Sequence, residues 1–93
     1  MEKTGRHKSL DKEVKRSVQW LMRYDYITKV VIGISESCRH KYAPGTLRWK
    51  SDVPGGIKIN AYSGNGVTDI FVKIDPIEKL ESVKDLINAR FPV

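Results

Sequence analysis

Apolar residues recur at helical spacing through residues 9–25, which predicts an amphipathic helix. Ser9 is suited to cap its N-terminus, and Asp11 and Glu13 place negative charge in the first turn, where the helix dipole favours it. Three basic side chains fall on the side opposite the apolar stripe: Lys12, Arg16 and Arg23. The helix is therefore expected to be apolar on one side and basic on the other.

Four later segments alternate apolar and polar residues, the period of a β-strand with one buried face. They cover residues 27–34, 47–50, 56–62 and 67–74. The residues expected to face inward are Val30, Ile32, Ile34, Leu47, Trp49, Ile57, Ile59, Ala61, Ile70, Val72 and Ile74. "SGNG" at 63–66 is typical of a hairpin connection between the last two strands.

A second helix is predicted to begin at Asp75, with Pro76 at its first position and Glu78 completing a capping box. Its buried stripe is expected to consist of Ile77, Leu80, Val83, Ile87 and Phe91.

The predicted order is αββββα. Short links between strands require mostly antiparallel pairing, and two helices with single apolar stripes can both cover one sheet face. We therefore predict an α+β fold: a two-layer sandwich with a mostly antiparallel four-stranded sheet, two helices on one face and the other face open to water. The pairing of the first two strands stays undecided. Residues 1–8 are expected to be a basic flexible tail, and residues 9–93 a single domain.

Composition narrows the class of protein. The chain has 93 residues and a single cysteine, so an internal disulfide is impossible. No apolar run has the length of a membrane span, and the charged N-terminus is unlike a secretory signal. We expect a cytoplasmic protein with no membrane partner.

Charge is distributed unevenly along the chain, whose formal net charge is +6. Residues 1–50 hold 12 Lys and Arg against 5 Asp and Glu, whereas residues 51–93 hold 5 against 6. Excess positive charge in one half favours an anionic partner. We predict a small basic binding module that contacts nucleic acid through a cationic loop and the open sheet face. The expected contact residues are Lys12, Arg16, Arg23, Arg39, Lys41, Arg48, Lys50, Lys58, Tyr62, Phe71 and Lys73.

A metal-binding structural module is the alternative interpretation. Cys38 and His40 form a C-x-H pair, to which His7 adds a third potential ligand, and thiolate with imidazole suits zinc. The chain has no C-x-x-C pair, and Arg39 and Lys41 would repel a cation beside the thiol.

Several segments resemble an uncharacterised prokaryotic domain family, known largely from archaea and described as predicted metal-binding. They are "RHKSL" at 6–10, "KVVIGI" at 29–34, the basic segment that follows, and "GGIKINAYSGNGVTDIFVKI" at 55–74. The resemblance implies a metal and supplies no catalytic residues.

Nothing in the sequence indicates an enzyme. The glycines of residues 55–66 flank a strand and do not form a phosphate loop, and Cys38 with His40 lacks an orienting third group. A third interpretation is a protein-interaction domain that forms a homodimer through Tyr62 and Phe71 on the open sheet face.

Overall fold

The structure, a computed structural model, describes residues 12–92. The predicted tail at residues 1–8, the Ser9 cap and the metal-ligand candidate His7 lie outside the described residues.

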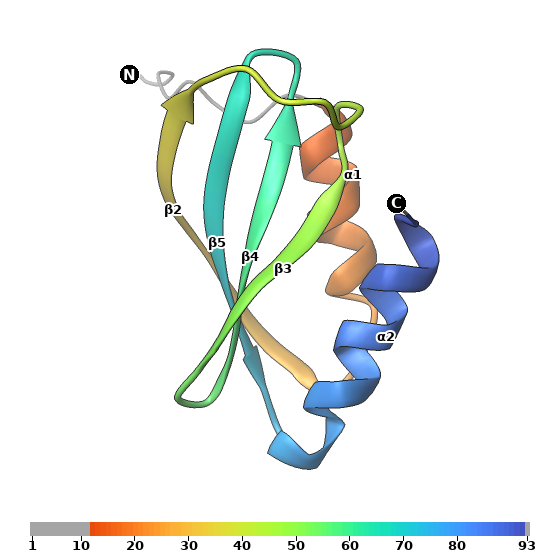
Figure 1. The fold of residues 1–93 in the computed structure, drawn as a ribbon. Coiled ribbons are helices and arrows are strands. Elements are labelled where there is room, and N and C mark those ends of the chain that lie inside the picture. Colours follow the sequence, from red (N-terminus) through yellow and green to blue (C-terminus); the bar gives the residue numbers. More distant parts are fainter. Residues whose placement is uncertain (1–11, 93) are drawn as a thin grey trace.

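Four strands form one antiparallel sheet in the spatial order β2-β5-β4-β3 (Figure 1). They are β2 (Ile27–Ser37), β3 (Leu47–Val53), β4 (Gly56–Ser63) and β5 (Gly66–Ile74). The predicted α+β class, the αββββα order and the antiparallel sheet are confirmed.

The first two strands, whose pairing the sequence left undecided, are the two edges of the sheet. The connection from Ser37 to Leu47 crosses the end of the sheet, past the hairpin that joins β4 and β5 (Figure 1). Backbone hydrogen bonds hold it there, from Cys38 N to Asn65 O and from Gly45 N to Tyr62 O. Strands β3, β4 and β5 follow one another through two hairpins, and β2 lies beside β5. This arrangement is a Greek key.

Helices α1 (Lys12–Leu21) and α2 (Leu80–Arg90) cover one face of the sheet, with α1 against β4 and α2 against β3 (Figure 1). Their buried residues meet the inward residues of the strands in one core: Val14, Val18, Leu21, Ile27, Leu47, Ile57, Ile59, Ala61, Ile70, Val72, Ile74, Val83 and Ile87. No helix within residues 12–92 is long and apolar enough to cross a membrane. The opposite sheet face carries no helix of the described chain (Figure 1). We call it the open face.

Both tight turns of the sheet form where glycine occurs. Val53 pairs with Gly56 across a two-residue turn of Pro54 and Gly55, whose φ of +83° is the left-handed conformation that glycine adopts without strain. The predicted hairpin at residues 63–66 is confirmed, because Ser63 pairs with Gly66.

The second helix starts later than predicted. A 3-10 turn occupies Ile77–Lys79 and the α-helix begins at Leu80. Pro76 is extended, with φ −74° and ψ 149°, so it cannot be the first helical residue, and no side chain of the described residues caps the turn. The predicted capping box is therefore wrong, and Ile77, expected in the buried stripe, is exposed.

The predicted inward face of the first strand is also wrong in part. The pairing of β2 with β5 shifts between Ile32 and Ser35, so Gly33 and Ile34 together lie opposite Asp69. Such a bulge changes the alternation of side chains along a strand. Ile34 therefore borders a surface hollow shared with Lys50 and Asp69 instead of joining the core.

Candidate nucleic-acid interface

Phe71 lies at the centre of a basic group on the open face. On the neighbouring strands it pairs with Lys58 of β4 and with Val31 of β2. Lys73 is two residues along the same strand, hence on the same face, and pairs with Lys29 of β2. We call Lys29, Lys58, Phe71 and Lys73 the lysine platform. It combines a half-buried aromatic ring with three ammonium groups drawn from three adjacent strands.

No carboxylate of the described chain neutralises the positive charges of the platform lysines. Among residues 12–92, none of the three forms an ion pair or a side-chain hydrogen bond. Lys29 and Lys73 are directly opposite one another, and like charges in that position destabilise a sheet. A bound anion would relieve this repulsion, so the platform is complementary to negative charge.

Two carboxylates lie on the other half of the open face. Lys50, a predicted contact residue, forms an ion pair with Asp69 at 3.3 Å. Glu36 lines the same shallow hollow as both of them. Mixed charge here repels a phosphate as much as it attracts one. The predicted cationic surface is therefore interrupted, and its continuous part is the lysine platform.

The loop between β2 and β3 is fixed to the end of the sheet by His40. The Nδ1 atom of His40 accepts a hydrogen bond from the Tyr42 amide at 3.1 Å, so Nε2 bears the hydrogen and donates it to the Ser63 carbonyl at 2.8 Å. The Tyr62 ring lies against His40 and Tyr42, with centroids 4.7 and 4.6 Å away. Tyr62, a predicted base-stacking residue, is thus largely occupied by the loop.

The remaining predicted cations are dispersed. Arg39 and Lys41 are exposed on the loop. Arg48 donates a hydrogen bond through Nη1 to the Phe91 carbonyl oxygen at 2.8 Å, and its guanidinium lies 5.7 Å from the centre of the Tyr42 ring. This residue ties β3 to the end of α2, a structural role.

The basic side of α1 faces away from the open face. Lys12, Arg16 and Arg23 are exposed on or just beyond the helix, whose buried residues pack on the other side of the sheet. A single short oligonucleotide lying flat on the open face would not reach them. The structure does not unite these cations with those of the lysine platform.

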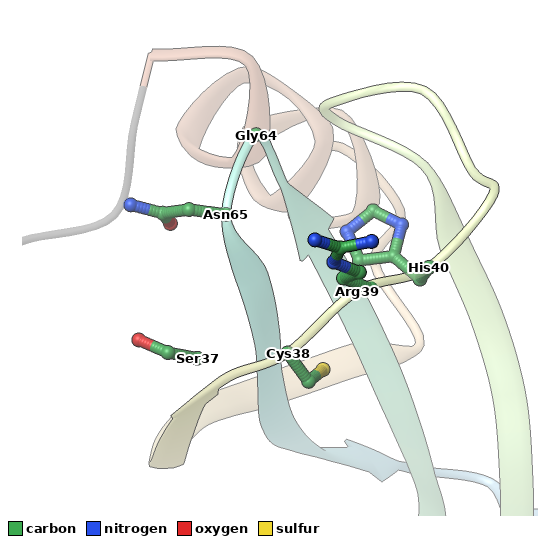
Figure 2. A pocket seen from close by; sticks show the side chains of 6 residues that line it. All are labelled: Ser37, Cys38, Arg39, His40, Gly64 and Asn65. Atoms are coloured by element: carbon green, nitrogen blue, oxygen red, sulfur yellow. The ribbon is translucent and has the colours of Figure 1, made fainter.

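The two described metal-ligand candidates, Cys38 and His40, do not converge on one point. His40 would have to give up the bond from Tyr42 to coordinate a metal through Nδ1. Cys38 and His40 both line an open hollow of about 530 Å³. Figure 2 shows that the Cys38 thiol and the His40 ring point in different directions from the loop. Within the described part of the chain, no three His, Cys, Asp or Glu side chains form a group able to hold a metal ion. The zinc site stays a prediction, since His7 is not described.

Sequence reasoning missed one member of the platform. Lys29 lies between Ile27 and Val30, at the start of the first strand. Alternation with the inward Val30 could have placed it on the open face. Its position opposite Lys73 could not have been found, because the sequence left open which strand is the neighbour of β2.

Comparisons with protein-family models, with curated proteins and with solved structures found no match to this chain. The resemblance to the prokaryotic family accordingly stays a prediction.

Proposed function

We propose that this protein binds single-stranded nucleic acid on the open face of its sheet. Phe71 stacks on a base, while Lys29, Lys58 and Lys73 neutralise the phosphates on either side. The observation that carries the proposal is the arrangement around one accessible ring of three ammonium groups that have no ion-pair partner among residues 12–92. Aromatic stacking combined with a cationic surface is the usual basis of sequence-tolerant single-strand binding.

The geometry favours a single strand over a duplex. A base can reach the Phe71 ring only if its own face is exposed, as in an unpaired strand. The basic side of α1, the other cationic surface that could follow a duplex backbone, lies on the other side of the molecule from the platform. The carboxylates of Glu36 and Asp69 further limit the footprint to the half of the open face nearest Lys29 and Lys73.

The proposal is tested by fluorescence anisotropy with a labelled single-stranded oligonucleotide at two salt concentrations. Replacing Lys29, Lys58 or Lys73 by Ala is expected to weaken binding several-fold and to reduce the salt slope by about 0.7 for each lysine. Phe71→Leu keeps an apolar side chain but removes the stacking face, so affinity is expected to fall roughly tenfold.

The matched control is Arg16→Ala, which removes an exposed cation from α1. It is expected to leave single-strand affinity unchanged. Binding that is undetectable even at low salt would contradict the proposal, as would an equal loss of affinity in the Arg16 and Lys58 variants. Preference for a duplex, abolished by Arg16→Ala, would move the site to α1.

A further inference from the structure

Strand β2 forms an open edge of the sheet. It is the longest strand of the described chain, with 11 residues, and within residues 12–92 it has only β5 as a neighbour. Its outer edge carries backbone amide and carbonyl groups beside which residues 12–92 place no strand, and such an edge is a template for another strand. We propose that a second copy of this chain pairs with it through its own β2, antiparallel, forming a homodimer. This proposal rests on the strand edge and does not require nucleic-acid binding, although Lys29 takes part in both.

The other edge of the sheet is guarded in the ways that natural proteins commonly use. Strand β3 is shorter, and three of its seven residues are charged: Arg48, Lys50 and Asp52. It also packs against α2. The Lys84 ammonium of α2 lies 4.5 Å from the Trp49 ring and 3.6 Å from Asp52. These contacts place α2 over the helix face of β3, next to its edge. The short, charged strand β3 is therefore less suited to accept another strand than the longer β2.

The middle of β2 exposes apolar side chains on both faces. Val31 and Ile34, on the open face, are 42% and 75% exposed, and Ile32, on the helix face, is 51% exposed. The helices lie over β3 and β4, so they do not cover this half of β2. Exposed apolar surface at an unpaired strand edge is typical of an interaction site. Pairing of two β2 strands would bring both sets together.

The charged side chains at the two ends of β2 favour a second copy of the chain as the partner and an antiparallel direction for the paired strands. Lys29 lies near the start of β2 and Glu36 near its end, with the apolar residues between them. Neither forms an ion pair among the described residues. In an antiparallel pair related by a two-fold axis, Lys29 of each copy approaches Glu36 of the other, giving two equivalent attractive contacts. A parallel pair would instead place like charges together.

The resulting dimer has a single continuous sheet. A two-fold axis perpendicular to the sheet keeps the helices of both copies on one side and joins the two open faces on the other. The lysine platforms of the two copies then lie on the same surface.

The test exchanges the charges at the two ends of β2 and measures oligomeric state by sedimentation velocity of the full chain without nucleic acid. The unmodified protein is expected to approach dimer mass as its concentration rises toward the millimolar range. Lys29→Glu alone and Glu36→Lys alone create two repulsive contacts each, so each is expected to raise the dissociation constant roughly tenfold or more. An equimolar mixture of the two variants is expected to recover the dimer, because each repulsive contact then becomes attractive.

Two control variants make the same charge changes on the helical layer, away from β2. Lys15→Glu on α1 and Glu78→Lys before α2 are exposed and should leave dimerisation unchanged. A strict monomer at every concentration would overturn the proposal. So would a dimer that is insensitive to the β2 variants but dissociated by Phe71→Lys, which would identify a face-to-face dimer through the open face. Failure of the variant mixture to associate would exclude the antiparallel pairing.

Discussion

Gly45 occupies a position that other residues fit poorly, for two separate reasons. Its φ is +95°, and a Cβ atom added to it would lie 2.9 Å from the Cβ of Glu13 on α1. The close approach lets the Gly45 carbonyl accept a hydrogen bond from the buried Ser17 hydroxyl, fixing the loop to the helix. We expect Gly45→Ala to lower the free energy of unfolding by about 2–3 kcal/mol, measured by chemical denaturation.

Gly55→Ala separates the effect of positive φ from the effect of the close contact with Glu13. Gly55 also has positive φ, at +83°, but a Cβ atom added to it would have no atom of the described residues within 4 Å. This variant should therefore show the backbone strain alone, about 1 kcal/mol. Equal losses of stability at both glycines would mean that contact with Glu13 has no energetic effect.

Among the elements, the loop between β2 and β3 is held by two hydrogen bonds of the His40 imidazole, which donates one to a backbone carbonyl and accepts one from a backbone amide. Removing them with His40→Ala frees the Tyr42 amide and the Ser63 carbonyl. We expect a loss of about 1–2 kcal/mol in the free energy of unfolding. Hydrogen exchange at the Tyr42 amide should become faster, because its acceptor is gone.

Arg39→Ala is the control, since its side chain is exposed on the same loop and forms no hydrogen bond or ion pair with the described residues. It should change neither stability nor exchange at Tyr42. A His40→Ala variant with unchanged Tyr42 exchange would contradict the proposed anchoring. A metal-dependent gain in stability of the unmodified protein, lost in both His40→Ala and Cys38→Ser, would instead support the zinc interpretation.

In the molecule as a whole, the core lies on one side of a single sheet. Ile59 is fully buried at its centre, whereas Ile34 is 75% exposed at its edge. The same substitution should therefore have very different effects: about 2–5 kcal/mol of lost stability for Ile59→Ala and less than about 0.5 kcal/mol for Ile34→Ala. Thermal or chemical denaturation at low protein concentration compares them. Similar losses at the two positions would contradict a core confined to the helix side.

The core of the sheet could be predicted almost completely from sequence. Ile57, Ile59 and Ala61 alternate with polar residues in β4, and the structure buries all three. The same holds for the inward residues of β5. Alternation is a property of the extended backbone itself, so a local pattern is sufficient to assign the two faces.

The candidate site was predictable only in part. Lys58, Phe71 and Lys73 were expected on the open face, and the register confirms that they share it. Lys50 and Arg48 were predicted contact residues, and in the structure their side chains contact Asp69 and the Phe91 carbonyl. Asp69 is 19 residues from Lys50 along the chain, and Phe91 is 43 from Arg48. No local pattern contains contacts at such separations.

The class of fold, the antiparallel strands and most of the core follow from the order of the residues, because each depends on the period of apolar positions within one segment. Three features emerge only in three dimensions: β2 and β3 are opposite edges, a bulge turns Ile34 out of the core, and Lys29 lies opposite Lys73. These features depend on how distant segments pair. Pairing is selected by the packing of the whole core and by the loop that crosses the end of the sheet, so it is a property of the folded molecule.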